Sequence, residues 1–178
     1  MLAKEIINIS GGLPQAPYII AEAGVNHEGS MSLARRLIEE AAEAGADAIK
    51  FQTYRADSIA VRKSPAYWDL EKEPTTSQHE LFSKYDKFWK SEFEQLKSHC
   101  DKTGIEFLST PFDIESAIFL NDLMGAFKIS SSDITNKPFI QFMARFGKPF
   151  LLSTGASNKN EIEAALGWID EKKTPTAL

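Results

Sequence analysis

The chain has 178 residues, enough for one domain with a sizeable core, and 43% of them are hydrophobic. Its net charge of −5 provides no extended positive field, which argues against nucleic-acid binding. The longest apolar runs, such as 18–21 and 150–152, are far shorter than a membrane span, and the first ten residues lack the apolar stretch of a signal peptide. We therefore expect a cytoplasmic protein that binds neither nucleic acid nor membrane.

Short apolar runs alternate with longer amphipathic segments along the chain. The apolar runs predict strands at residues 18–25, 46–53, 105–110, 127–131 and 149–154. The amphipathic segments predict helices at residues 31–44, 114–124, 137–146 and 158–170. Ser30 or Ser32 is expected to cap the first helix, and Gly45 to end it. Alternation of this kind is typical of an α/β protein whose parallel strands are joined by helices.

The segment from residue 55 to about residue 90 interrupts this alternation. It is polar, contains two prolines and carries several aromatic side chains. Long connections without clear elements are usually functional or disordered, and the aromatic content argues against disorder. We interpret the segment as an ordered flap with a short helix near residues 78–85. The flap is expected either to cover the functional site or to contact a neighbouring subunit.

Cys100 is the only cysteine of the sequence, so an internal disulfide and a cysteine metal cluster are both excluded. It follows Phe93 and Leu96 at helical spacing. This spacing predicts a buried and unreactive thiol.

Each predicted strand begins with apolar residues and becomes polar toward its carboxyl end. The polar residues in question are Glu22, Lys50, Gln52, Ser109, Thr110, Lys128, Ser130, Ser131, Ser153 and Thr154. The carboxyl ends of the strands form the catalytic face of a (βα) barrel, so this distribution favours a TIM barrel over a doubly wound sheet. No G-x-G-x-x-G loop follows the first strand, which weakens the dinucleotide-binding alternative. We predict a single domain over residues 1–178, of the TIM-barrel type, with about five βα units.

Lys50 and Lys128 are the strongest indications of a functional site. Burial of an unpaired ammonium group costs several kcal/mol, so a lysine inside an apolar strand normally meets an anion. Internal pairing, with Glu22 or Asp133, is one interpretation. In the other, both ammonium groups face a phosphate or carboxylate of a substrate. Hydroxyl groups suited to binding an oxyanion come from Ser109, Thr110, Ser131, Ser153 and Thr154.

The roles of the two carboxylates remain open at this stage. Glu22 either neutralises the lysines or binds sugar hydroxyls, and Asp133 either caps the loop after the fourth strand or acts in proton transfer. His27 is expected in a solvated loop, and His79 and His99 are expected to be structural. No pair of His, Asp or Glu residues has convincing metal-ligand spacing.

Five runs of the sequence carry a family resemblance. They are IIAEAGVNHEGS (19–30), GADAIKFQTY (45–54), FLSTPFD (107–113), FKISSSDITNKPFI (127–140) and GKPFLLSTGAS (147–157). From about Pro17 to Ile169 the chain resembles the N-acetylneuraminate (sialic acid) synthase family, whose members make sialic, legionaminic and pseudaminic acids. The resemblance implies condensation of phosphoenolpyruvate with an N-acetylated amino sugar, such as N-acetylmannosamine, with C–O cleavage and release of phosphate.

The resemblance also implies roles for individual residues. The family's phosphoenolpyruvate-binding positions match Lys50, Thr110, Lys128, Ser131 and Ser153. Glu22 matches a position that contacts the sugar, and Asp133 matches an acidic position implicated in proton transfer. Gln52 lies on the same strand face as Lys50 and is added as a substrate-binding residue.

The resemblance has consequences for the length of the chain. Family members continue with further barrel strands, two metal-binding histidines and usually a C-terminal antifreeze-like domain. The sequence ends at Leu178, where the resemblance places the start of a sixth strand. We therefore expect the later barrel strands and the C-terminal domain to be absent from this chain and the chain to be inactive by itself. The resemblance also implies a divalent metal, Mn²⁺ or Mg²⁺, whose ligands lie outside this chain. It implies a homodimer as well.

Two other functions remain open. One is a Schiff-base aldolase that uses Lys50 or Lys128 as its nucleophile. The other is a non-catalytic, truncated barrel that acts as a binding or interaction module.

Overall fold

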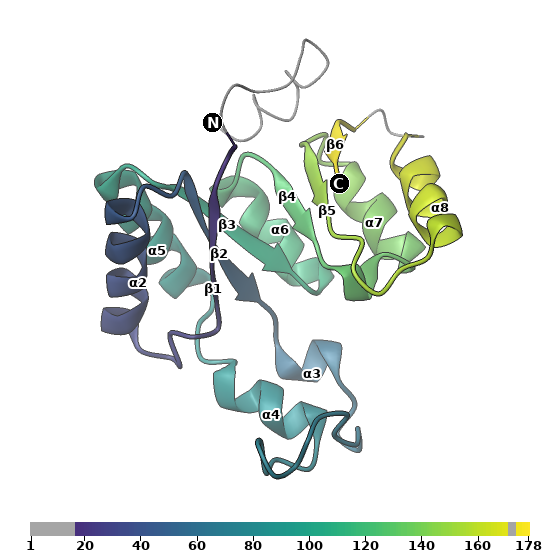
Figure 1. Cartoon of the computed structure of the whole chain (residues 1–178), viewed down its shortest axis with the longest axis horizontal. Helices are drawn as coiled ribbons and strands as arrows, with labels where there is room; N and C mark the ends of the chain where they lie inside the picture. Colours follow the sequence, from purple (N-terminus) through teal and green to yellow (C-terminus); the bar gives the residue numbers. More distant parts are fainter. Residues whose placement is uncertain (1–16, 171–173) are drawn as a thin grey trace.

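The computed structural model describes residues 17–170 and 174–178 (Figure 1). One parallel sheet has the order β1-β2-β3, with β1 (Ile20–Gly24), β2 (Ala48–Thr53) and β3 (Glu106–Pro111). A second parallel sheet has the order β4-β5-β6, with β4 (Phe127–Ile129), β5 (Phe150–Leu152) and β6 (Thr176–Ala177). β4 lies next to β3, so the strands follow one another in chain order (Figure 1).

Helices connect the strands and cover one side of the sheets. They are α2 (Met31–Glu43), α3 (Ala56–Ile59), α4 (Gln78–Tyr85), α5 (Lys90–Thr103), α6 (Ile114–Leu123), the 3₁₀ turn η2 (Ser131–Asp133), α7 (Lys137–Ala144) and α8 (Lys159–Asp170). None of the helices in the described ranges is long and apolar enough to cross a membrane.

Local sequence signals explain where several helices begin and end. Ser30 caps α2 as predicted, since its hydroxyl accepts a hydrogen bond from the Leu33 amide at 3.3 Å. The side chain of Asp113 accepts a hydrogen bond from the Ser116 amide at 2.8 Å and so caps α6. Gly104 ends α5 with a φ of +84°, a left-handed conformation that glycine adopts without strain.

The strands separate a large core from a smaller one. The large core packs alternate strand residues such as Ile49, Phe51 and Ile129 against the helices. The smaller cluster, built on Ala48 and Leu108, lies on the opposite strand face, because successive side chains of a strand point to opposite faces. The even-numbered side chains of β2 therefore point away from the helices, and this opposite face carries the polar groups discussed below.

The structure confirms an α/β fold with parallel strands but modifies the predicted barrel. The described residues form two three-stranded sheets and no closed barrel. The fifth strand does not form an edge, because β6 pairs with β5 through Phe150↔Thr176 and Leu151↔Ala177. Strands four and five are also shorter than predicted: their polar ends, including Ser153, lie in the loops that follow.

The flap between residues 55 and 90 is an ordered subdomain beyond the carboxyl end of β2 (Figure 1). The predicted helix at residues 78–85 is confirmed as α4, whereas α3 was not predicted. Arg55 and Asp86 clamp the base of the flap through an ion pair of 2.9 Å, and the Ala56 amide donates to the same carboxylate. The Trp68 indole N–H donates to two backbone carbonyls, and these hydrogen bonds order the tip of the flap.

Candidate active site

Lys50 lies in the middle of β2 and is only 8% exposed. Its ammonium group forms an ion pair with Glu22, which stands directly opposite it in the pairing of β1 with β2. It also donates a hydrogen bond to the Thr110 hydroxyl of β3 at 3.4 Å. Internal pairing is therefore correct for Lys50 and Glu22, while 53% of the Glu22 side chain stays exposed and open to a ligand.

A bulge in β1 brings Glu22 close to Gln52. Glu22 pairs with Lys50 and Gly24 pairs with Phe51, so one extra residue of β1 is inserted between these two pairs. Gly24 has a φ of +54°, and a Cβ atom there would lie 3.5 Å from Glu22 Oε1 and 3.7 Å from Gln52 Nε2. Glycine permits both the backbone turn and the approach of the two polar side chains.

Lys128 extends from β4 toward the same charged cluster. Its ammonium group donates to the carbonyl oxygen of Ile129 at 2.8 Å. Burial, followed by the positive charge of Lys50, lowers the pKa of Lys128 from 10.5 to about 8, while the charge of Glu22 acts in the opposite direction. The two predicted lysines are thus close enough to repel each other.

The loops after β4 and β5 lie side by side. The Ser153 amide donates to the carbonyl oxygen of Ile129 at 3.1 Å, which holds the end of β5 against the end of β4. A Cβ atom at Gly155 would lie 3.6 Å from the hydroxyl of Ser131. The structure therefore brings the segment that carries Ser153 next to Ser131, as expected for strands whose carboxyl ends share one edge.

Asp133 occupies the end of η2, just after the predicted fourth strand. Its Oδ2 atom is buried and has no hydrogen-bond partner among the described residues. Burial raises the pKa of Asp133, and a hydrogen bond from the Asn136 side chain opposes this effect in part. A carboxyl group in this state is suited to carrying a proton.

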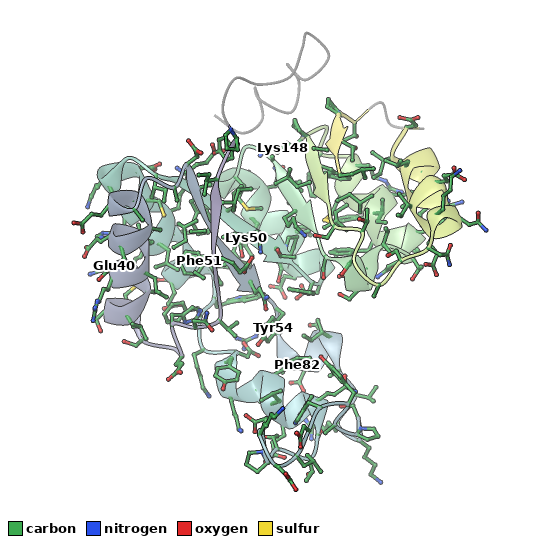
Figure 2. The ribbon with its side chains drawn as sticks, viewed as in Figure 1. Glu40, Lys50, Phe51, Tyr54, Phe82 and Lys148 are labelled. Carbon is green, nitrogen blue, oxygen red and sulfur yellow. The ribbon has the colours of Figure 1, made fainter. Side chains whose placement is uncertain are left out.

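A cavity of about 750 Å³ lies between the flap and the strand ends. Its lining includes the aromatic rings of Tyr54, Phe82, Tyr85 and Phe112 and the polar side chains of Gln52, Ser132, Asp133 and Asn136. Figure 2 shows Lys50 on the sheet, and Tyr54 and Phe82 further along toward α4. Two of the predicted residues, Gln52 and Asp133, thus line the cavity, whereas the lysines lie beside it.

Comparison with known proteins identifies the family. The sequence profile described as the NeuB family matches residues 37–178. The chain belongs to the NeuB family. The N,N′-diacetyllegionaminic acid synthase of Campylobacter jejuni is 44% identical over 151 residues, which cover 83% of this chain and 45% of that protein.

Solved structures have a similar fold. The N-acetylneuraminic acid (sialic acid) synthetase of Leptospira borgpetersenii, solved in complex with citrate, matches with a TM-score of 0.75 and 36% identity over 89% of this chain and 52% of that one. A truncated 3-deoxy-D-arabino-heptulosonate 7-phosphate synthase of Thermotoga maritima matches with a TM-score of 0.62 over 89% of this chain and 48% of that one. At 13% identity this second likeness concerns the fold alone. The NeuB-family chain spans about half the length of the relatives that it matches.

Sequence patterns did not predict the aromatic residues that line the cavity, and the prediction for one histidine was wrong. Tyr54 and Phe112 follow β2 and β3 directly, and this position after a strand end was the available signal. His27 was expected to be solvated, but it is 1% exposed and stacks on Phe88 at 4.2 Å. Burial lowers the pKa of His27 to about 4, so its ring is neutral near pH 7 and packs as an aromatic side chain.

The other histidines and the cysteine agree with the sequence predictions. His79 contacts Asp57 at 2.7 Å within the flap, and His99 contacts Glu39 at 2.9 Å between α5 and α2. Cys100 is buried, and burial raises the pKa of its thiol to about 12.

The divalent metal that the family resemblance implies does not fit the described residues. No group of three or more His, Cys, Asp and Glu side chains in residues 17–170 and 174–178 is arranged to hold a metal ion. The carboxylate beside the lysines, Glu22, is already paired with Lys50. We therefore assign no metal-dependent step to these residues.

Proposed function

We propose that this chain provides the phosphoenolpyruvate-binding part of a nonulosonic acid synthase. The observation that carries the proposal is the approach of two lysines, Lys50 and Lys128, from separate strands to one partly exposed carboxylate, Glu22. Two ammonium groups against one carboxylate leave an excess positive charge beside a cavity. An anion such as a phosphate ester is the ligand that this charge arrangement favours.

In the proposed complex, the phosphate and carboxylate of phosphoenolpyruvate lie between the two lysines. The Thr110 hydroxyl, already in contact with Lys50, and the hydroxyls of Ser131 and Ser153 supply neutral hydrogen bonds to the same oxygens. The charges are fixed by the strands before the ligand arrives, so little reorganisation is needed as charge develops in the reaction.

The proposed reaction forms one carbon–carbon bond and replaces the bond between C2 and the phosphate oxygen with a bond between C2 and a water oxygen. C3 of phosphoenolpyruvate attacks the aldehyde carbon of the open-chain amino sugar, and the aldehyde oxygen takes up a proton. Water adds to the cation left at C2 and loses a proton. The tetrahedral adduct then expels phosphate from C2 to give the 2-keto acid. Asp133 is the proposed proton carrier, because its raised pKa and unpartnered oxygen allow it to hold a proton beside the cavity.

Glu22 and Gln52 are proposed to contact the sugar. Glu22 on β1 keeps more than half of its side chain exposed while it pairs with Lys50, and Gln52 on β2, the strand of Lys50, lines the cavity. The names of the relatives give products with one or two acetylated amino groups, which supports an N-acetylated amino sugar as the second substrate.

Calorimetric titration of the 178-residue protein with phosphoenolpyruvate tests the proposal. We expect binding that weakens with added salt and a loss of tenfold or more in Lys128→Ala and in Lys50→Ala. Each charge-assisted hydrogen bond contributes about 1.5–3 kcal/mol, and about 1.4 kcal/mol corresponds to a tenfold change in affinity. Lys159→Ala is the matched control, because the Lys159 side chain is 86% exposed on α8. Equal affinities for the wild type and both site variants would contradict the proposal.

The lowered pKa of Lys128 favours one alternative, a Schiff-base aldolase. A lysine with a pKa of about 8 has an appreciable fraction of neutral, nucleophilic amine near pH 7.5. Borohydride reduction in the presence of pyruvate, followed by mass spectrometry, separates the two functions. A stable pyruvate adduct on Lys128 would favour the aldolase, whereas the synthase route requires no imine.

A further inference from the structure

We propose that the flap, residues 56–85, is a hinged lid that turns as one rigid unit and closes over a ligand bound at the strand ends. Its hinge is the neck formed by residues 54–55 and 86–87. The inference rests on the proposed function for the ligand that drives closure, whereas the hinge itself is a property of the free protein. It adds a conformational step to a site whose charges the strands hold fixed.

The flap lies outside the cores that hold together the rest of the described chain, which we call the body. No hydrophobic side chain of residues 56–85 belongs to either core or packs against one. The helix α4 has no buried residue. Figure 1 shows α3 and α4 beyond the carboxyl end of β2, apart from the helices that cover the sheets. Burial of apolar surface is the main force that fixes one element on another, and it does not fix the flap on the body.

The neck carries the connections between the flap and the body. Arg55 and Asp86 form their ion pair across it at 2.9 Å, and the Ala56 amide donates to the same carboxylate at 2.9 Å. The ring of Tyr54 lies edge-on to Phe82 of α4 at 5.6 Å (Figure 2). Among the described residues, the hydrogen bonds and ion pairs that leave the flap all end within the neck. A few residues at the ends of elements are what a hinge consists of, because they absorb the change in backbone angles.

The flap is nevertheless well connected within itself. His79 of α4 contacts Asp57 of α3 at 2.7 Å, which joins the two helices. An antiparallel bridge pairs Pro65 with Ser77, and the Trp68 indole N–H donates to two backbone carbonyls of the flap. These contacts link α3, α4 and the tip, so motion at the neck moves the whole flap and leaves its internal distances unchanged.

Movement of the flap changes the cavity of about 750 Å³ directly. About half of the residues that line this cavity belong to the flap, among them Tyr67, Gln78 and Phe82, and the others come from the strand ends and the segments beside them. The Tyr67 residue is 77% exposed in the free protein. Closure onto a ligand buries apolar surface of this kind and excludes water from the lysine site, which strengthens the charge interactions there. A ligand favours the closed position only through contacts that the open position lacks, and the flap side chains supply them.

Distances between pairs of spin labels in the 178-residue protein, measured by double electron–electron resonance, test the inference. Each label is attached to a cysteine introduced at an exposed position, and Cys100 stays unlabelled because it is buried. One pair spans the hinge, a second lies within the flap and a third lies within the body. In this order the pairs are Val61→Cys with Ile114→Cys, Val61→Cys with Lys72→Cys, and Ser98→Cys with Ala164→Cys.

In the free protein we expect the distance distribution across the hinge to be wider than both control distributions. Addition of phosphoenolpyruvate together with N-acetylmannosamine should shift it to shorter distances and narrow it, while the two control distances stay the same. A hinge distribution as narrow as both controls in the free protein would overturn the inference. An unchanged hinge distribution under conditions in which calorimetry shows bound phosphoenolpyruvate would overturn it as well.

A variant of the ion pair and its matched control locate the hinge. Arg55→Gln removes the charge of the pair and leaves the Asp86 carboxylate to accept from the Ala56 amide, so the hinge distribution should widen further. Asp101→Asn breaks the ion pair of 2.6 Å with Lys97 on α5 and should leave all three distances unchanged. The absence of widening in Arg55→Gln, or equal widening in both variants, would contradict a hinge at this neck.

Calorimetric titration with phosphoenolpyruvate keeps the two proposals distinguishable. A wide hinge distribution in a free protein that does not bind phosphoenolpyruvate would refute the proposed function and leave the hinge in place. Binding of phosphoenolpyruvate that depends on Lys128, together with a narrow and unchanged hinge distribution, would refute the lid and leave the proposed function in place.

Discussion

Replacement of Lys128 by methionine separates the binding role of this residue from its effect on stability. Methionine keeps most of the length of the side chain and removes its charge. In the free protein the ammonium group is partly buried and repelled by Lys50, which is why its pKa is about 8 and not 10.5. The charge is therefore unfavourable for folding and, in the proposed function, necessary for binding the substrate.

The lowered pKa sets both the size and the pH range of the effect. The difference between 10.5 and about 8 corresponds to at most about 3 kcal/mol, since one pKa unit equals about 1.36 kcal/mol. Lys128 is only partly buried, so solvent screening reduces the expected value to about 1–2 kcal/mol. Because the folded-state pKa is lowered, the cost is fully present below pH 8 and disappears as the pH rises toward 10.5.

Urea unfolding of the wild type and of Lys128→Met at several pH values measures this effect. We expect the variant to be more stable by about 1–2 kcal/mol at pH 7, equal to the wild type near pH 10.5, and unable to bind phosphoenolpyruvate. Lys159→Met, on the exposed surface of α8, should change neither stability nor binding. A variant that is less stable at pH 7, with a difference that does not vary with pH, would refute the electrostatic reasoning.

Three further predictions concern the same cluster and the core. Binding of phosphoenolpyruvate at pH 8.5 should take up protons, because a bound anion raises the pKa of Lys128; calorimetry in buffers of different ionisation enthalpy measures this uptake. Lys50→Met should destabilise the protein by about 1 kcal/mol, opposite in sign to Lys128→Met, because Glu22 loses its partner; urea unfolding shows the sign. Cys100 should not react with a thiol reagent at pH 8 until the protein is unfolded, since burial raises its pKa to about 12; absorbance of the released reagent follows the reaction.

The strands and the groups at their ends were predictable because the signals are local. A lysine between apolar neighbours, as at Lys50 and Lys128, indicates a site whatever the rest of the fold does. The alternation of strands and helices then places both lysines at one edge of the sheet. The length of the strands was less predictable, because the same polar residues fit the end of a strand and the loop after it, and Ser153 lies in the loop.

The cavity could not be predicted in the same way, because it depends on contacts between distant parts of the chain. Tyr54 meets Phe82 of the flap and Phe112 of the next strand end, and nothing in their separate sequence contexts links the three rings. His27 illustrates the same limit: its burial results from stacking on Phe88, some sixty positions further along the chain. Local patterns identify the residues that carry charge, and tertiary packing decides what surrounds them.

The charge count at the strand ends argues against a purely structural role for the lysines. Internal pairing explains Lys50, whose ammonium group meets Glu22. It does not explain Lys128, which forms none of the ion pairs of the described residues and donates to a neutral carbonyl oxygen. A second buried cation beside the first is an arrangement that folding alone disfavours, as the lowered pKa of Lys128 records. An anionic ligand bound between the two ammonium groups would remove this repulsion, so the destabilising feature of the free protein is the one that favours binding of an anion.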